Sequence, residues 1–346
     1  MQETNLRKRS LLIGLLGLIS VGFLGELALE FLGFGKPALV RTDSPANYEL
    51  VANQNVRRMW PLSDSWVAHV RTNEYGMRSD PVSPTRITGT RRLYFLGDSM
   101  TWGTTQVDQS QIFTEIVHRD LPKLIQEPVE VLNGAISGWA PSNELEYLKE
   151  HGTQHADRVI LALNAGDPMQ PMSGKPNGFA IPSLECHPTF GYEELWIRVI
   201  EPTLARDLYL LHFRSSPGPD LKDPGIDVIS NEQALTENLA KIDEISQFSE
   251  ASGAKLSIVF FGIDPPGMNT AALPVEKRGR DAVARWAAAN DVPFIDLGPQ
   301  LSDYPAASIR LRDQVHFNVR GHAIVARAIL SAWNRVDPVS TAPPAK

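Results

Sequence analysis

Short apolar segments alternate with longer helical segments along the chain after Arg91, and this alternation limits the fold more than any other feature. The apolar segments cover residues 93–96, 129–132, 158–163, 256–261 and 292–295. Segments with helical periodicity cover residues 112–124, 143–150, 232–250, 275–289 and 319–333. Strands that alternate with helices in this way form a parallel sheet with helices on both faces. The sequence therefore predicts an α/β domain with a five-stranded parallel sheet, in which ligands bind at the carboxyl ends of the strands.

The charge balance and the cysteine count limit the partners of the chain. It has 346 residues, a formal net charge of −7 and a single cysteine, Cys186. A net negative charge argues against a nucleic-acid partner. One cysteine cannot form an intrachain disulfide, and the absence of a histidine and cysteine cluster in the sequence argues against a structural zinc site.

The N-terminal segment has the pattern of a transmembrane anchor. Three basic residues at 7–9 precede an uninterrupted apolar run over 11–25, and Glu26 and Glu30 then interrupt an apolar stretch that ends near Gly35. As a helix the first run would be about 22 Å long, whereas extension to Gly35 crosses a hydrocarbon core of about 30 Å. Both glutamates would then lie near the far interface, where a charge is less costly. The basic flank predicts a cytoplasmic N-terminus, with the rest of the chain outside the cytoplasm.

Two other interpretations of this segment remain open. It could be a cleaved signal peptide with an apolar region at 11–19 and a poor cleavage site at 20–22, or a buried helix of a soluble protein. The length of the span and the flanking charge favour the anchor. We therefore expect a single-pass protein of the cell membrane whose main domain faces the periplasm or the outer surface.

The chain divides further by composition. With the anchor at 1–36, we expect a small extension at 37–90, a main domain at 91–335 and a tail at 336–346. The extension lacks a helical period and contains short extended candidates and turn residues. Within the main domain, residues 167–230 carry many prolines and glycines. An insertion of this length predicts a lid or a substrate-binding element, although a neutral decoration of the rim fits nearly as well.

Ser99 lies directly after the first predicted strand, in the run Gly97-Asp98-Ser99. A turn at the carboxyl end of a strand exposes a hydroxyl and leaves neighbouring backbone N–H groups free to bind an oxyanion. A serine needs a base to remove its proton before it attacks. We interpret Ser99 as a nucleophile, although the same tripeptide also fits an ordinary turn or a helix cap.

His316 follows the last predicted strand and precedes the final helix, in the run Asp313-Gln314-Val315-His316. A histidine acts as a general base when a carboxylate holds its other ring nitrogen, and Asp313 is on the same loop for that role. The two residues alone would also suit a surface turn. Their position at the same sheet edge as Ser99 favours a catalytic pair, with His316 as the base and Asp313 as its orienting group.

Gly138 follows the second predicted strand, in the run Ser137-Gly138-Trp139. A residue without a side chain lets a backbone N–H approach a reacting carbonyl oxygen. Gly138 is therefore a candidate oxyanion donor, although a glycine here also fits a simple turn.

The order serine, glycine, histidine at three strand ends resembles the SGNH/GDSL hydrolase family, over about residues 91–335. The serine block at 96–99 and the histidine block from Asp313 to Gly321 match well, and the glycine block matches through Gly138. The resemblance implies a flavodoxin-like three-layer α/β/α fold and the hydrolysis of acyl esters on sugars or lipids, with no metal and no cofactor. The upstream segment 72–78 resembles a short element that precedes the catalytic domain in membrane-anchored bacterial members.

One block departs from the family pattern of Gly-x-Asn-Asp after the third strand, in which the asparagine is an oxyanion donor. Here the run is Asn164-Ala165-Gly166-Asp167, so Asp167 matches and a glycine replaces the expected asparagine. The resemblance leaves Asn164 as the candidate third donor, beside the N–H groups of Ser99 and Gly138. The loss of one such donor lowers the rate by about 10²–10³-fold.

The motifs predict a serine esterase that hydrolyses acyl esters of an envelope or extracellular glycan or lipid. Among these, acetyl esters are the favoured substrates. The replaced asparagine keeps a second class open, a carbohydrate-binding or assembly protein with the same fold and little turnover. The same residues would also support transfer of acyl groups between glycans, with a sugar hydroxyl in place of water.

Overall fold

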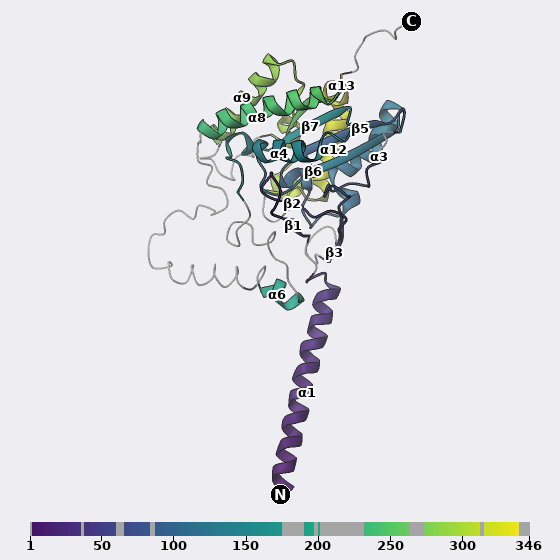
Figure 1. The fold of residues 1–346 in the computed structure, drawn as a ribbon, viewed down its shortest axis with the longest axis vertical. Helices are drawn as coiled ribbons and strands as arrows, with labels where there is room; N and C mark the ends of the chain where they lie inside the picture. The colour runs from purple at the N-terminus through teal and green to yellow at the C-terminus, as the bar shows by residue number, and fades with distance from the viewer. Residues whose placement is uncertain are drawn as a thin grey trace.

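The computed structural model describes one N-terminal helix and a domain built around a sheet (Figure 1). The described residues are 2–35, 38–59, 66–83, 87–174, 190–196, 200, 232–262, 273–311 and 315–338.

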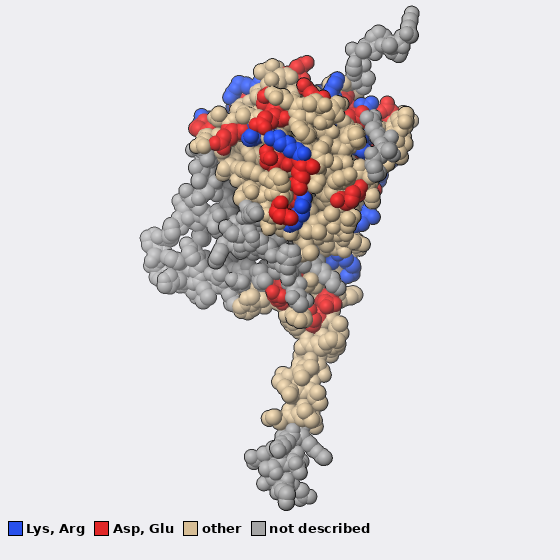
Figure 2. All heavy atoms as spheres, in the orientation of Figure 1, with Lys and Arg blue, Asp and Glu red and all other residues tan. Residues whose placement is uncertain are grey.

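The N-terminal helix α1 (Gln2–Phe31) extends away from the sheet domain. Its segment Ser10–Phe31 is long and apolar enough to cross a membrane, with a mean hydropathy of 2.1, and its most apolar part is not buried against the rest of the chain. The middle of α1 carries no charged side chain on the face shown in Figure 2. This exposure argues against the buried helix of a soluble protein and leaves a membrane span or a signal sequence.

The segment after α1 forms two antiparallel hairpins instead of helices. Apolar side chains of this extension, among them Tyr48, Val70 and Met77, are fully buried and belong to the same hydrophobic cluster as one face of the central sheet. The extension therefore packs on the sheet domain. Its paired strands are β1 (Val40–Arg41) with β2 (Glu49–Leu50) and β3 (Asn55–Met59) with β4 (Val67–Arg71).

The central sheet has five parallel strands in the order β6-β5-β7-β8-β9. This order is that of flavodoxin-like doubly wound sheets, and it confirms the predicted fold class. Each strand agrees with its predicted segment to within three residues at either end. The strands are β5 (Arg91–Gly97), β6 (Val129–Ala135), β7 (Arg158–Leu163), β8 (Lys255–Phe260) and β9 (Phe294–Asp296).

The strands contribute alternate side chains to two hydrophobic cores, one on each face of the sheet. In β5, Leu93 and Phe95 enter the core beneath α3 and α12, whereas Tyr94 and Leu96 enter the core beneath α4, α8 and α9. This alternation follows from the two-residue period of a strand and explains why these strands are apolar throughout. The covering helices are α3 (Phe113–Ile125), α4 (Pro141–His151), α8 (Glu232–Ala251), α9 (Leu273–Ala289) and α12 (Val319–Ser331).

Shorter elements occupy the loops between these strands and helices. Of the predicted insertion at 167–230, the structure describes residues 167–174, 190–196 and 200. The remainder lies outside the described residues, as do residues 339–346 of the predicted tail. The short elements are α2 (Ser99–Trp102), η1 (Gln109–Gln111), η2 (Asp167–Met169), α6 (Gly191–Leu195), α10 (Gly298–Leu301), α11 (Ala306–Ile309) and α13 (Trp333–Val336).

Candidate active site

Three loops leave one edge of the sheet at aligned strand ends. Gly97 of β5 is in register with Ala135 of β6 and Ala162 of β7. Ser99, Gly138 and Asn164 follow these three ends within a few residues. Because β5 lies between β6 and β7, the fold brings the three predicted residues to the same edge of the sheet, where ligands bind in this fold class.

Ser99 is the first residue of α2, and Asp98 is the N-cap of that helix. The Asp98 carboxylate accepts a hydrogen bond from the Met100 backbone N–H at 3.0 Å through Oδ1 and from the Ser99 hydroxyl at 3.3 Å through Oδ2. The cap fixes the turn after β5, and with it the start of α2. Ser99 itself is 7% exposed, so most of the residue is buried.

The amide of Asn164 has a fixed orientation. Its Oδ1 accepts hydrogen bonds from the backbone N–H groups of Gly166 at 2.6 Å and Asp167 at 3.2 Å. Its Nδ2 donates to Asp98 Oδ2 at 2.6 Å, the same oxygen that accepts from Ser99. The NH₂ group therefore faces the serine loop, and the turn after β7 holds it there.

Asp98 is the centre on which these groups converge. Burial raises the pKa of its carboxyl group. Hydrogen bonds from Met100 and Asn164, the charge of His316 and the hydrogen bond from Ser99 oppose that rise. Because His316 acts electrostatically on Asp98, its imidazole lies near the carboxylate of Asp98, which accepts the hydrogen bond from the Ser99 hydroxyl.

The loop that carries His316 is held by backbone and side-chain hydrogen bonds. The carbonyl of His316 accepts from the N–H of Leu311 at 2.7 Å, and the next residue, Phe317, forms a bridge with Arg310. Asn318 caps α12 by accepting from the N–H of Gly321 at 2.9 Å. Asp313 lies outside the described residues, so its role as the orienting carboxylate stays a prediction.

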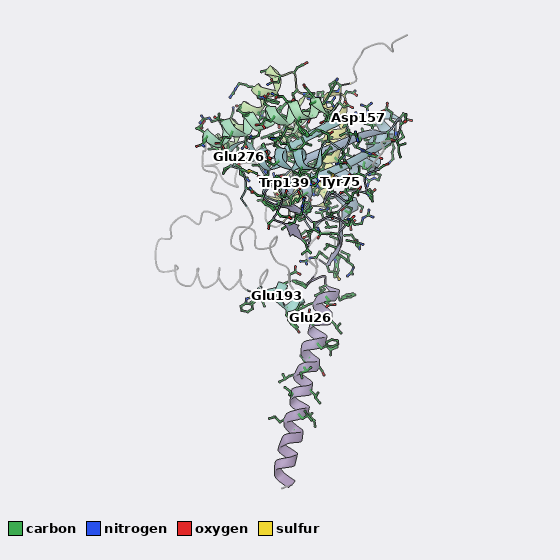
Figure 3. The ribbon with its side chains drawn as sticks, viewed as in Figure 1. Glu26, Tyr75, Trp139, Asp157, Glu193 and Glu276 are labelled. Atoms are coloured by element: carbon green, nitrogen blue, oxygen red, sulfur yellow. The ribbon has the colours of Figure 1, made fainter. Side chains whose placement is uncertain are left out.

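Gly138 has a positive φ of 83°, a conformation that glycine adopts without strain. Its carbonyl accepts hydrogen bonds from the Ser173 hydroxyl and from Gln170 Nε2, the latter at 2.7 Å. On the other side, the Tyr48 hydroxyl donates to the carbonyl of Ser137 at 2.7 Å, and Trp139 (labelled in Figure 3) donates to the carbonyl of Tyr48 at 3.1 Å. Residues from the extension and from the segment after β7 thus fix this turn.

Arg78 is a residue of the site region that the sequence did not single out. It is completely buried, and burial lowers the pKa of its guanidinium to about 10. The guanidinium donates to the carbonyls of Trp102 at 2.8 Å, Thr104 at 2.6 Å and Val107 at 2.7 Å. Since these carbonyls belong to the end of α2 and the loop that follows it, Arg78 holds the segment after Ser99. The only signal in the sequence was its place at the end of segment 72–78.

Two buried carboxyl groups lie near Asp98. Glu144, in the first turn of α4, and Asp167 are both fully buried. Among the described residues, the two carboxyl oxygens of Glu144 have no hydrogen-bond partner. In Asp167, Oδ2 accepts a hydrogen bond from the Asn164 N–H, and Oδ1 has no partner among these residues. Burial raises the pKa of both groups well above the usual range, and the negative charge of Asp98 adds to the rise in each. The raised pKa favours the neutral form of Glu144 and Asp167, which avoids two further charges beside Asp98.

Glu144→Gln tests this protonation state. A carboxyl group whose pKa is raised by folding binds more protons in the folded state, so it stabilises the fold below its unfolded pKa and loses that contribution as pH rises. Such a group gives a slope of up to about 1.4 kcal/mol per pH unit in the free energy of unfolding. We expect the free energy of unfolding to fall less in the variant than in the parent as pH rises from about 5 to about 8, as measured by urea unfolding.

Glu146→Gln is the matched control for Glu144→Gln. Glu146 lies on the same helix, where its partly exposed carboxylate pairs with Lys149 at 3.2 Å. We expect this variant to follow the pH dependence of the parent protein. Parallel stability curves for the parent and Glu144→Gln would show that Glu144 ionises as it does in the unfolded chain.

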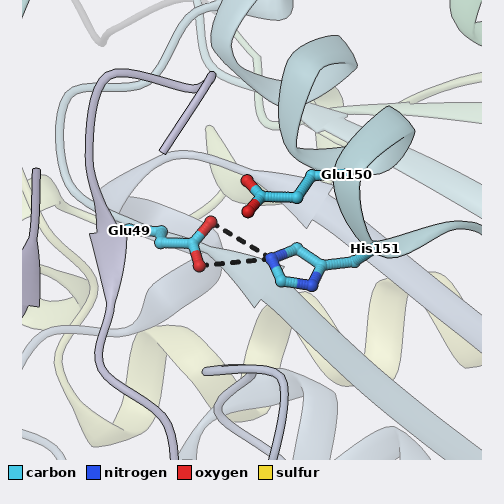
Figure 4. A group of neighbouring side chains, drawn as sticks. All are labelled: Glu49, Glu150 and His151. Carbon is cyan, nitrogen blue, oxygen red and sulfur yellow. Dashed lines mark hydrogen bonds and ion pairs between the residues drawn. The ribbon is translucent and has the colours of Figure 1, made fainter. Parts of the chain in front are cut away.

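A second group of titratable residues lies between the extension and α4 (Figure 4). Glu49, Glu150 and His151 have ligand atoms within 4.8 Å of one another, and His151 Nε2 lies 3.1 Å from Glu49 Oε2. The guanidinium of Arg41 pairs with both carboxylates, at 2.6 Å from Glu49 and 2.7 Å from Glu150. Because the guanidinium of Arg41 already supplies a positive charge to both carboxylates, we interpret this group as an ionic contact between the extension and α4 rather than as a metal site.

The fold and the strand-end residues are those of a hydrolase with a flavodoxin-like sheet and a serine after the first strand of that sheet. The comparison with protein families agrees: residues 95–324 match the GDSL-like lipase/acylhydrolase family. The match covers more than half of the chain, so the chain belongs to this family and its main domain is that of a serine ester hydrolase. No curated protein sequence matches the chain.

Solved structures of esterases and of another hydrolase are similar to the chain at low identity. A catalytic mutant of the acetylxylan esterase Axe2 from Geobacillus stearothermophilus is 17% identical, with a TM-score of 0.43 over 71% of this chain and 95% of that one. LAE5, an alpha/beta hydrolase enzyme from the metagenome of Lake Arreo, is 13% identical, with a TM-score of 0.45 over 71% and 96%. The psychrotrophic esterase EstA from Pseudoalteromonas sp. is 11% identical, with a TM-score of 0.42 over 71% and 97%. At these identities and TM-scores, the similarity gives no information about the substrate of this chain.

Proposed function

We propose that this chain is a membrane-anchored esterase that removes acetyl or other short acyl groups from a glycan or lipid outside the cytoplasm. In this proposal α1 spans the membrane and the domain at 91–335 carries the chemistry. The observation that carries the proposal is the convergence of Ser99 and Asn164 on Asp98, at neighbouring strand ends of a family member.

The proposed reaction uses Ser99, His316 and Asp313 in turn. Ser99 Oγ attacks the ester carbonyl carbon while His316 takes its proton, and Asp313 orients the imidazole. The tetrahedral intermediate then collapses, and the alcohol leaves with the proton from His316. Water, deprotonated by His316, attacks the acyl-serine and releases the carboxylic acid.

The oxyanion would be held by the backbone N–H groups of Ser99 and Gly138 and by Asn164 Nδ2. The direction of the Asn164 amide, toward the serine loop, supports its role as the third donor. A side chain at position 166 would start 3.2 Å from Asn164 Oδ1, so the two positions compete for one region of the loop. This proximity supports the proposal that Asn164 takes the role that the family gives to an asparagine two residues later.

Asn164→Ala tests this assignment. We expect kcat for p-nitrophenyl acetate to fall by about 10²–10³-fold, because one oxyanion donor is removed. Adding Gly166→Asn to that variant restores the family pattern and should recover part of the loss. Asn290→Ala, at an exposed asparagine after α9, serves as the control. A kcat within threefold of the parent in Asn164→Ala, about the level of the control, would remove Asn164 from the oxyanion site.

Hydrolysis and covalent labelling test the proposal as a whole. The purified full-length protein should react with a fluorophosphonate probe and release acetate from an acetylated oligosaccharide or a short-chain ester. Product analysis with an added sugar acceptor separates hydrolysis from acyl transfer. A protein that neither labels nor cleaves any of these esters, yet binds the glycan, would favour the binding or assembly function.

A further inference from the structure

The short helix α6 (Gly191–Leu195) lies against the last turns of α1, and Figure 1 and Figure 3 show the two elements side by side. Glu26 Oε1 accepts a hydrogen bond from the N–H of Gly191 at 2.5 Å, and Glu26 Oε2 accepts from the N–H of Tyr192 at 3.2 Å. One turn deeper along α1, the carbonyl of Gly22 accepts from the Tyr192 hydroxyl at 3.1 Å. A Cβ at Gly25 would lie 1.7 Å from that hydroxyl oxygen, so the contact requires glycine there.

The other side of α6 is held by the extension. Glu194 is fully buried, and it pairs with Arg58 at 2.6 Å and accepts from the N–H of Gly35 at 2.5 Å. A helix of five residues is not stable alone in water. These contacts on both sides therefore fix α6 at the point where α1 ends and the extension begins.

Large aromatic side chains are exposed in α6 and at its two caps. Phe190 is 59% exposed, Tyr192 45% and Trp196 52%. On α1 itself, Leu27 is 46% exposed and Phe31 65%. A group of large apolar side chains that is exposed next to a candidate membrane span marks a surface that binds another apolar phase. Tyrosine and tryptophan in particular suit the boundary between lipid chains and water.

The length of α1 places this group at that boundary. The 22 residues Ser10–Phe31 make a helix of about 33 Å, slightly longer than a hydrocarbon core of about 30 Å. Glu26 then lies about 7.5 Å from the end of the span. A carboxylate at this depth is costly unless it is hydrogen-bonded. The two N–H groups of α6 supply those bonds, and Glu26 in turn satisfies two free N–H groups at the start of α6.

We propose that the aromatic edge of α6, by which we mean the exposed side chains of Phe190, Tyr192 and Trp196 in this helix and at its caps, binds the headgroup and acyl boundary of a phospholipid bilayer as a second membrane contact. The inference rests on the membrane anchoring proposed above for α1. The protein is then held to the bilayer by α1 and by part of the insertion that follows β7. Two contacts restrict rotation of the catalytic domain about α1, so its strand-end site keeps one orientation toward the membrane.

Fluorescence quenching in bilayers tests this contact. The full-length protein is reconstituted in phosphatidylcholine vesicles whose acyl chains carry bromine either near the carbonyl end or near the methyl end. We expect stronger quenching by the shallow bromine, and Trp196→Phe should remove most of that difference. Trp286→Phe is the control, because Trp286 lies on α9 against the protein core, and it should retain the difference. Equal shallow quenching of the parent and Trp196→Phe would overturn the proposal.

A pair of glycine variants tests whether α1 positions the aromatic edge. Gly25→Val drives a side chain into the Tyr192 hydroxyl and should reduce the shallow quenching that depends on Trp196. Gly17→Val adds the same side chain where no atom lies within 4 Å and should leave the quenching unchanged. Undiminished quenching in Gly25→Val would refute the role of this contact.

Flotation with vesicles separates this inference from the anchoring itself. If the parent protein floats and keeps its N-terminus but Trp196 is not quenched, only the α6 contact is wrong. If the parent protein does not float, or if its N-terminus is cleaved near residues 20–22, the anchoring proposal and the α6 contact both fail.

Discussion

Replacing Ser99 with alanine should lower kcat for p-nitrophenyl acetate by on the order of 10⁴-fold or more, and should abolish labelling by a fluorophosphonate probe. The variant keeps the oxyanion donors and the loop, but no hydroxyl remains to form the acyl intermediate. Asp98 still caps α2 through its bond to the Met100 N–H, so the fold around the site should persist. Steady-state kinetics and mass spectrometry of the labelled protein measure both effects.

Ser252→Ala is the matched control for this loss. Its hydroxyl donates to the carbonyl of Phe248 at 2.9 Å at the end of α8, just before β8 begins, and therefore at the opposite edge of the sheet. We expect parental activity and labelling in this variant. A Ser99→Ala protein that still labels at another serine would show that the nucleophile lies elsewhere.

Arg78→Ala should destabilise the protein by about 3–5 kcal/mol, because it breaks a buried hydrogen-bond network that is centred on one guanidinium. The substitution leaves the carbonyls of Trp102, Thr104 and Val107 buried without their donor. Unpaired buried carbonyls each cost about 1–3 kcal/mol. Because these carbonyls follow Ser99 in the chain, activity at temperatures where the variant stays folded should fall as well. Urea unfolding and kcat/KM measure the two effects.

Two other arginine variants interpret that result. Arg71→Ala removes an exposed side chain that pairs with Asp80 at 3.1 Å, and we expect a change within about 1 kcal/mol. Arg78→Lys keeps the charge but cannot reach three carbonyls with a planar group, so an intermediate loss is expected. If Arg78→Ala had the same urea midpoint of unfolding as the parent, the hydrogen bonds of Arg78 would not stabilise the fold.

The sheet and its main helices could be predicted because their information is local. Each buried strand is a short apolar run, and each covering helix repeats its apolar residues with helical spacing. The contacts that hold the site loops carry no such pattern. Arg78 reaches the carbonyls of Trp102 and Thr104, and Tyr48 reaches that of Ser137. A backbone carbonyl is present at every residue, so no residue type in the sequence marks the acceptor.

The position of Asn164 shows a second limit of sequence reasoning. Spacing alone put it two residues before the expected asparagine, with no sign of whether it would face the serine. The answer depends on the turn after β7, in which Asn164 Oδ1 binds the N–H groups of Gly166 and Asp167 and turns Nδ2 toward Asp98. That rotation results from hydrogen bonds within the folded loop, which single-sequence patterns do not encode.

The hairpin extension has a consequence for where this protein can be cut. The family match begins at residue 95, yet Tyr48, Val70 and Met77 complete the core on one face of the sheet. Arg78 and Tyr48 also support the turns that carry Ser99 and Gly138. The folded core therefore starts well before the region that defines the family, and the residues between α1 and β5 act as internal scaffolding of the site rather than as a tether.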